Sequence, residues 1–160
     1  MQGNKKIALY ADVTGADLTY DNFIHGIANL EQTGEIFCAK IYNASERRHK
    51  EILREVAARG YDVAPPQRGK KAPKAFDNRI TVDIMEDVLQ NTNLDAVAVI
   101  APPADLVYLF RRLRSYNIFI MTLDNGDEET SALVDEFLDI GRVDKLQPAR
   151  PKQKKPAPGG

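Results

Sequence analysis

Along most of its length the sequence alternates between short apolar runs and longer stretches with helical periodicity, and this alternation constrains the fold more than any other feature. The apolar runs have the length and the β-branched content of buried strands, and they cover residues 7–11, 36–42, 61–64, 96–101 and 118–123. The stretches between them place apolar residues three and four positions apart, over residues 18–30, 46–59, 76–91, 102–116 and 128–136. Residues 137–140 have the pattern of a short additional edge strand. The predicted order is therefore βαβαβαβαβα, with this optional final strand.

The same alternation predicts the fold class. Strands that alternate with helices form a parallel sheet, and right-handed crossovers place the helices on both of its faces. The run Ala-Val-Ala-Val-Ile-Ala at residues 96–101 is apolar without interruption, which is typical of a central strand covered on both sides. We therefore predict an α/β protein with a three-layer α/β/α open parallel sheet.

Composition separates a folded body from a different C-terminal segment. Hydrophobic residues make up 43% and charged residues 28% of the 160 residues, which is typical of one globular domain. Residues 141–160 carry six basic residues against one acidic residue, together with four prolines and a terminal Gly-Gly. Such a segment buries too little apolar surface to fold. We expect a domain over residues 1–140 and a basic, Pro-rich, disordered tail over residues 141–160, which either aids solubility or contacts nucleic acid.

Two further observations concern compartment and cross-links. Cys38 is the single cysteine, which excludes an intramolecular disulfide. No apolar run approaches the roughly 18 residues that span a membrane, and the first residues lack an apolar stretch of signal-peptide length. We therefore expect a cytoplasmic protein that does not insert into a membrane.

Acidic residues lie near the carboxyl ends of the predicted strands, where open parallel sheets bind their ligands. Asp12 comes directly after the first strand, and Asp105 lies four residues beyond the fourth. Asp77 is a candidate N-cap of the third long helix, and Asp83 lies within that helix. Carboxylate clusters suit Mg²⁺ or Mn²⁺, which bind oxygen ligands, water and phosphate. The alternative is structural, because aspartates commonly cap helices and an acidic helix face is commonly solvated.

Other chemistries have little support in the sequence. The turn after the first strand, Asp-Val-Thr-Gly-Ala-Asp at residues 12–17, lacks the G-x-G-x-x-G motif of a dinucleotide site, and no P-loop motif occurs. His25 and His49 are expected on helices, without a matched serine or cysteine nucleophile.

Three segments together resemble the NYN domain, a branch of the PIN-like nucleases that includes LabA-like bacterial proteins. The first strand ends in Asp12, and the helix after the third strand opens with a K-x-x-D-x5-D signature formed by Lys74, Asp77 and Asp83. After the fourth strand, residues 101–106 (Ala-Pro-Pro-Ala-Asp-Leu) stand where the family has an S-G-D-S-D-F type of turn. The resemblance covers nearly the whole predicted domain and implies a PIN-like, Rossmann-like sheet.

For function, the resemblance implies a metal-dependent ribonuclease. Asp12, Asp77 and Asp83 would hold Mg²⁺ or Mn²⁺, with Asp105 as a further catalytic carboxylate. Such an ion polarises the scissile phosphate and activates a water molecule. The loop before the third long helix would bind the RNA backbone, because its positive charges offset the repulsion between phosphates and an acidic pocket. The basic residues of this loop are Arg68, Lys70, Lys71 and Lys74.

Two departures from the family pattern bear on the acidic site. Pro103 stands where the family places the first aspartate of the turn after the fourth strand, and Gly15 stands where it places an asparagine. A proline side chain offers no ligand atom, so we expect a degenerate acidic site with reduced or lost activity.

Two other functions stay open. One is a non-catalytic module that binds RNA or a protein partner, or forms a homo-oligomer, through the basic loop, the tail and the helix end that carries Arg111, Arg112 and Arg114. A receiver-like regulatory domain is less favoured, because paired acidic residues do not follow the first strand.

Overall fold

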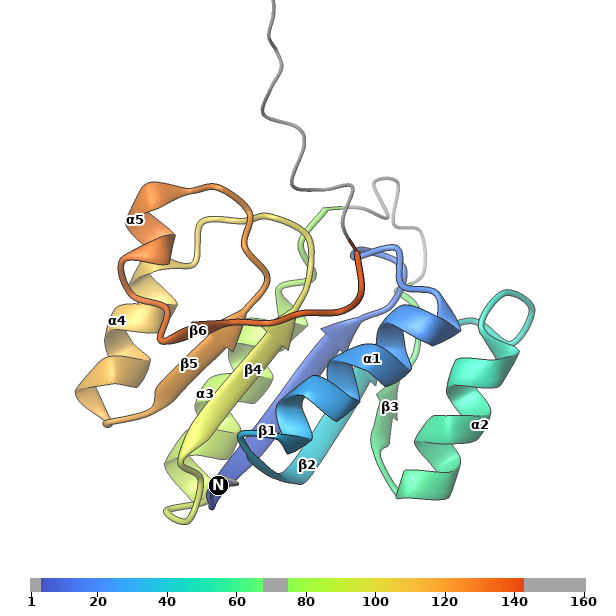
Figure 1. The fold of residues 1–160 in the computed structure, drawn as a ribbon, viewed down its shortest axis with the longest axis horizontal. Helices are drawn as coiled ribbons and strands as arrows, with labels where there is room; N and C mark the ends of the chain where they lie inside the picture. Colours follow the sequence, from blue (N-terminus) through green and yellow to red (C-terminus); the bar gives the residue numbers. More distant parts are fainter. Residues whose placement is uncertain (1–3, 68–74, 143–160) are drawn as a thin grey trace, which may run out of the picture.

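The computed structural model describes residues 4–67 and 75–142, which form a sheet of six parallel strands with one helix in each connection (Figure 1). The strands are β1 (Lys5–Asp12), β2 (Gly34–Tyr42), β3 (Asp62–Ala64), β4 (Ala96–Ile100), β5 (Phe119–Thr122) and β6 (Glu136–Phe137). The helices are α1 (Tyr20–Glu31), α2 (Lys50–Arg59), α3 (Arg79–Gln90), α4 (Val107–Ser115) and α5 (Glu128–Ser131). The strand order across the sheet is β3-β2-β1-β4-β5-β6.

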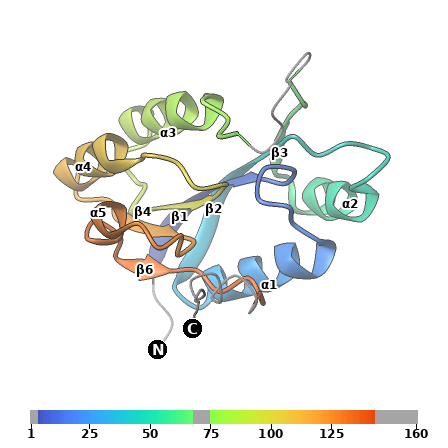
Figure 2. The same cartoon turned by 90° about the horizontal axis from the view of Figure 1, so that it is seen from above.

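Helices cover both faces of this sheet, as Figure 2 shows from above. α1 and α2 pack on one face, and α3 and α4 pack on the other. The predicted three-layer α/β/α parallel sheet and its alternating order of strands and helices are therefore confirmed. Within the described residues, no helix combines the length and the apolar character needed to cross a membrane.

The two central strands, β1 and β4, supply both layers of the core. Ile7 and Leu9 of β1 pack with the apolar side chains of α1, whereas Tyr10 lies on the opposite face with those of α3 and α4. Every residue of β4 is buried, as a strand covered on both faces requires. This explains why the sequence of β4 is apolar without the alternation of a half-exposed strand.

α3 is held to its face of the sheet by side chains spaced one helical turn apart. It buries Ile80, Ile84 and Val88, and each buried side chain of this kind contributes about 1.5–3 kcal/mol relative to exposure. These contacts fix the distance between the first turn of α3 and the sheet, and therefore also the position of the residues that precede the helix.

Several helix boundaries differ from the prediction, including the start of α2, which is Lys50 instead of residue 46. α4 begins at Val107 instead of residue 102, because Pro103 disfavours the helical conformation at Pro102 and the turn before α4 buries Pro102. Asp77 is not the N-cap of α3, since Asn78 takes that position. α5 is a single turn, Glu128–Ser131, instead of a helix over residues 128–136.

The strand order reverses between β1 and β4, which identifies the crevice where such sheets bind ligands. The loops that follow these two strands meet at their carboxyl ends. A Cβ atom on Gly15 would lie only 2.9 Å from Cδ of Pro102, so a glycine is required for this close approach.

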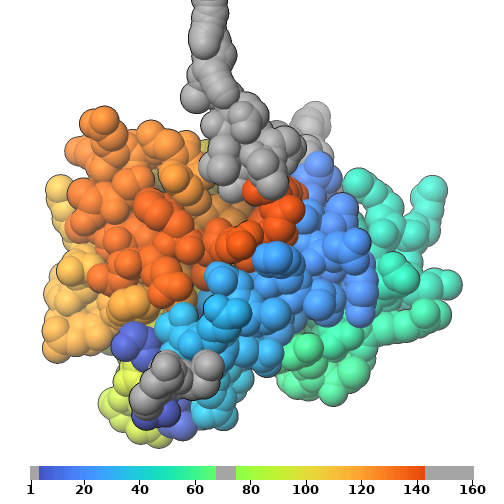
Figure 3. Space-filling model, in the orientation of Figure 1, coloured from blue at the N-terminus to red at the C-terminus, as the bar shows by residue number. Residues whose placement is uncertain are grey.

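The last described residues cross the face of α1 and reach the same end of the molecule (Figure 3). Asn22 of α1 donates to the carbonyl oxygen of Ile140 at 3.0 Å, and the Arg142 guanidinium donates to the carbonyl oxygens of Ala16 and Asp17. Arg142 thus fastens the end of the described chain to the loop after β1. The remainder of the predicted basic tail, from residue 143, lies outside the described residues.

Candidate functional site

Asp12 ends β1 and lies at the carboxyl edge of the sheet with no solvent exposure. Its Oδ1 accepts hydrogen bonds from the backbone N–H of Gly15 at 2.8 Å and from Nδ2 of Asn43 at 3.0 Å. A Cβ on Gly15 would lie 2.7 Å from Cγ of Asp12, so only glycine allows the turn to close around this carboxylate. Gly15, which stands where the family has an asparagine, is therefore required by the close packing around Asp12.

Asp77 lies directly before α3 and is also buried. Its Oδ2 accepts from Nδ2 of Asn43 at 3.0 Å, and its Oδ1 accepts from the backbone N–H of Arg79 at 3.0 Å. The Arg79 guanidinium adds bonds from Nε to Oδ1 at 3.1 Å and from Nη2 to Oδ2 at 2.8 Å. Since one Asn43 amino group binds both carboxylates, Asp12 and Asp77 belong to one buried network.

This network determines the ionisation of Asp77. Burial by itself would raise the pKa of the Asp77 carboxyl, but the hydrogen bonds from Arg79 and Asn43 outweigh burial and hold that pKa below its ordinary value. Asp77 is therefore a carboxylate near neutral pH, with a positive charge bound to it.

Sequence reasoning missed Asn43 and Arg79. Asn43 directly follows β2 and adopts a φ of 61°, a left-handed conformation that asparagine tolerates better than most residues. Its position after a strand, the same criterion that identified Asp12, was an available signal. Arg79 had no comparable signal, because nothing in an Asp-Asn-Arg sequence says that the arginine folds back on the aspartate two positions before it.

The structure gives Asp83 a different set of partners from Asp12 and Asp77. Its Oδ2 accepts from the Tyr42 hydroxyl at 2.7 Å and from Nζ of Lys40 at 3.3 Å. One turn further along α3, Asp87 accepts from the Tyr10 hydroxyl at 2.7 Å. Two buried tyrosines on neighbouring strands thus bind two carboxylates on α3 and align the helix with the sheet.

Burial of these tyrosines, together with their bonds to the aspartates, raises the pKa of both hydroxyls. Both hydroxyls therefore remain protonated donors at any physiological pH.

Of the other positions that the sequence indicated, Asp105 and Pro103 are described, and neither joins the network. Asp105 is exposed, and its Oδ1 accepts from the backbone N–H of Val107 at 3.2 Å, so its carboxylate serves the first turn of α4. Pro103 is also exposed. The predicted RNA-binding residues Arg68, Lys70, Lys71 and Lys74 lie outside the described residues.

The donor set can be compared with what Mg²⁺ or Mn²⁺ requires. Such ions need several oxygen ligands that face a common point. Both oxygens of Asp77 already face Arg79, and Asp83 faces Tyr42 and Lys40. Over residues 4–67 and 75–142, no three His, Cys, Asp or Glu residues are grouped so that they could hold a metal ion. In this arrangement the residues present do not fit a divalent cation.

A groove of about 590 Å³ adjoins the network on the β3 side of α3. Its lining includes Lys40, Val63, Gln67, Arg79 and Asp83. The side chains of Arg79 and Lys40 are 32% and 33% exposed, so positive charge is accessible from this groove. An anion that approaches the buried aspartates from this side meets the two cations first.

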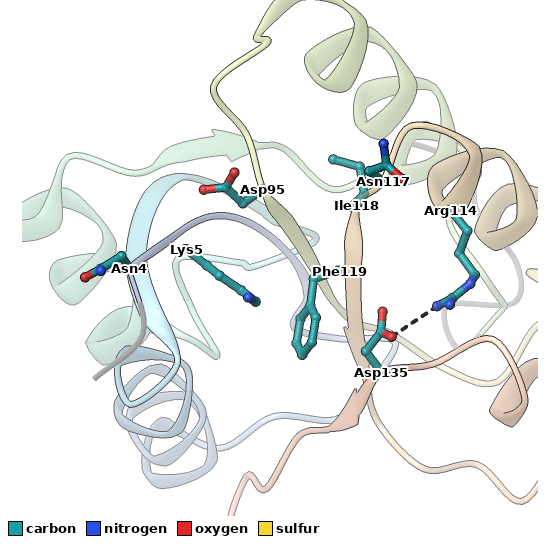
Figure 4. Close-up of a pocket in the computed structure, with 8 residues that line it drawn as sticks. All are labelled: Asn4, Lys5, Asp95, Arg114, Asn117, Ile118, Phe119 and Asp135. Carbon is teal, nitrogen blue, oxygen red and sulfur yellow. Dashed lines mark hydrogen bonds and ion pairs between the residues drawn. The ribbon is translucent and has the colours of Figure 1, made fainter. Parts of the chain in front are cut away.

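A second hollow, of about 550 Å³, lies at the amino end of the sheet (Figure 4). Lys5 extends over the Phe119 ring at 4.7 Å, and Arg114 pairs with Asp135 at 3.1 Å. The other Asp135 oxygen accepts from the backbone N–H of Ile120 at 2.8 Å. Asp95 likewise accepts from the backbone N–H of Lys6 at 2.9 Å. Both acidic side chains therefore hold strand ends, and parallel sheets bind ligands at the opposite edge, so we assign this hollow a structural role.

Comparison with known proteins agrees with the fold described above. The family model of the NYN domain matches residues 6–141. Among solved structures, a protein of unknown function from Vibrio parahaemolyticus RIMD 2210633 is similar to this chain, with a TM-score of 0.56 and 21% sequence identity, over 86% of this chain and 94% of that chain. At this identity the likeness concerns the fold alone. No protein of curated function matches the chain.

Proposed function

The chain belongs to the NYN domain family, and from this premise we propose that it binds RNA at the carboxyl edge of its sheet and hydrolyses it slowly or not at all. The family has a PIN-like, nuclease-type fold, and its members are generally nucleic-acid binding and use divalent metals. Membership of the LabA-like branch rests on the K-x-x-D-x5-D spacing and stays a prediction.

The observation that carries the proposal is the Asp12–Asn43–Asp77 connection. Two buried carboxylates from different parts of the chain lie in one hydrogen-bonded network, next to the point where the strand order reverses. The third position, after β4, holds Pro103 instead of an aspartate, and the nearby Asp105 is engaged with α4. These positions support a binding site at the position that the family uses, with an incomplete set of carboxylates.

Positive charge beside this position supports an RNA ligand. Lys40 and Arg79 line the groove next to the network. The described residues that flank the basic loop of the sequence lie beside the network, since Gln67 lines the same groove and Ala75 stands two residues before Asp77. The basic residues at positions 68–74 fall between these two points in the sequence, and we expect them to contact phosphates, which strengthens binding without reading sequence.

The first experiment measures the affinity of the full chain for a labelled single-stranded RNA at several salt concentrations. We compare the wild type with K70E/K71E and with R111E/R112E, which has the same change in charge on α4. We expect affinity to fall steeply with salt and to be lost in K70E/K71E alone. An effect of R111E/R112E as large as that of K70E/K71E would contradict binding at the carboxyl edge.

The second experiment measures cleavage of the same RNA with Mg²⁺ or Mn²⁺ supplied. We compare the wild type with D12N, which removes one buried carboxylate, and with P103D, which adds a carboxylate after β4. Slow or undetectable wild-type cleavage is expected, with an increase in P103D. Rapid wild-type cleavage that D12N abolishes would instead establish an active nuclease.

A further inference from the structure

The acidic network contains a cation that the chain itself supplies. The Arg79 guanidinium contacts both oxygens of Asp77, with Nη2 to Oδ2 at 2.8 Å, Nε to Oδ1 at 3.1 Å and Nε to Oδ2 at 3.2 Å. The Asp77 side chain has no exposure, whereas the Arg79 side chain is 32% exposed. Arginine–carboxylate pairs with two parallel bonds are strong and geometrically specific. The accessible side of Asp77 is therefore closed by a bound positive charge.

The orientation of the Asn43 amide depends on the same arginine. Its Oδ1 accepts from Nη2 of Arg79 at 3.3 Å, and its Nδ2 therefore points toward the carboxylates of Asp12 and Asp77, at 3.0 Å from each. A divalent cation between these carboxylates would need oxygen ligands around it. The Asn43 amino group presents hydrogens instead, so Arg79 opposes a metal ion both by its own charge and through the amide that it orients.

The third predicted ligand is also paired with a cation of the chain. Asp83 accepts from Lys40 at 3.3 Å and from the hydroxyl of Tyr42 at 2.7 Å. The Arg79 guanidinium in turn lies over the Tyr42 ring, 5.6 Å from its centre. Arg79 and Lys40 therefore pair with Asp77 and Asp83, respectively. Tyr42 connects the two pairs, because its ring contacts Arg79 and its hydroxyl donates to Asp83.

We propose that the Arg79 guanidinium takes the place of a divalent cation beside Asp77, so that the wild-type site does not bind Mg²⁺ or Mn²⁺ and removal of the charge of Arg79 creates a cation site. Loss of this charge leaves Asp77 with a free face and allows the Asn43 amide to turn its oxygen toward the carboxylates. The cation content of the site does not depend on RNA binding, so the two can be tested separately.

The test is a titration of Mn²⁺ into the full-length protein, followed by calorimetry and by the EPR signal of free Mn²⁺. R79Q keeps a polar side chain without the charge, and R79K keeps the charge. We expect no saturable site in the wild type or in R79K up to about 1 mM, and in R79Q a site at least about tenfold tighter than this limit. The double variant D77N/R79Q should lose that site again.

R59Q is the matched control. Arg59 also pairs with a carboxylate, Glu55, at 2.7 Å, and its side chain is 30% exposed, but it lies on α2. R59Q changes the net charge as R79Q does, and we expect no Mn²⁺ site in it. If a folded R79Q bound Mn²⁺ no more tightly than R59Q, the proposal would be overturned.

A thermal melt shows whether R79Q is stable enough to study. If it is not, Mn²⁺ titrations of the wild type and D77N still test the proposal. We expect no saturable Mn²⁺ site in the wild type or in D77N. A saturable site in the wild type that D77N abolishes would overturn the proposal. RNA affinity is measured on the same samples in EDTA. A wild type that does not bind RNA refutes the proposed function, whereas the Mn²⁺ titrations still decide the role of Arg79.

Discussion

Replacing Asn43 by glycine isolates the contribution of the amide that joins the two buried aspartates. Asn43 has a φ of 61°, which glycine adopts without strain, so the change removes the side chain and leaves the backbone conformation accessible. The variant loses the bonds from Nδ2 to Asp12 and to Asp77 and the bond from Arg79 to Oδ1. The backbone carbonyl of Asn43, which accepts from the Thr14 hydroxyl at 2.6 Å, is unaffected.

The expected magnitude follows from the nature of the acceptors, of which Asp77 is a charged carboxylate. A hydrogen bond to a charged group contributes about 1.5–3 kcal/mol, and glycine adds about 0.5–1 kcal/mol of conformational freedom to the unfolded chain. Both aspartates are buried, so water replaces the lost donors only in part. We expect N43G to lower the free energy of unfolding by about 3–5 kcal/mol, which in a chain of this size lowers the melting temperature by about 6–20 °C.

The assay is urea unfolding followed by far-UV circular dichroism, with N117G as the matched control. Asn117 also has a positive φ, 62°, but it is exposed on the turn after α4. The control should change stability by no more than about 0.5 kcal/mol, as surface substitutions usually do. If N43G were within about 1 kcal/mol of N117G, the amide would not hold the aspartates together and the reasoning would be refuted.

Three further predictions concern the same edge of the sheet. G15A should lower stability by about 1–3 kcal/mol in denaturant unfolding, because the added Cβ would lie 2.7 Å from Cγ of Asp12; a neutral result would show that the turn can move away. The stabilising contribution of Asp77, whose folded-state pKa lies below the ordinary value of about 4, should be complete above that pH and be lost as the pH falls through the folded pKa. Acid unfolding curves should therefore be flatter for D77N than for the wild type, and parallel curves would contradict this assignment. Y42F should cost about 1–2 kcal/mol in thermal unfolding, because the fully buried hydroxyl donates to Asp83 at 2.7 Å; equal stability would mean that Lys40 alone holds the carboxylate.

The order of the elements and the fold class could be predicted because they depend on local periodicity. The uninterrupted apolar run of β4 indicated a strand covered on both faces, and the structure buries all of it. Boundaries were less predictable where a turn competes with a helix. The apolar pattern continues across residues 102–106, but Pro102 packs into the loop after β1, so α4 begins only at Val107.

The position of the candidate site could also be predicted from the sequence, since an aspartate directly after a buried strand must lie at the carboxyl edge of a parallel sheet. For Asp12 this placement agrees with the structure. The hydrogen-bond partners of each carboxylate could not be predicted from the sequence. A helix that contains Asp83 can present it to solvent, to a metal or to a neighbouring strand, and the hydroxyl of Tyr42, 41 positions away in the sequence, decides between them.

By itself, then, the sequence determined which segments become strands and helices, which faces of them are buried and at which edge the acidic residues collect, because each of these depends on side-chain spacing within one segment. Only the tertiary structure decided what balances the charge of those residues. Asn43 lies 31 positions from Asp12 and 34 from Asp77, and it reaches both only because β1, β2 and the start of α3 come together at one edge. Arg79 is close to Asp77 in the sequence, but its side chain could point either way from the helix. A buried carboxylate is stable only when hydrogen bonds and a positive charge replace its lost hydration. This is the physical reason why the Arg79 guanidinium turns toward Asp77.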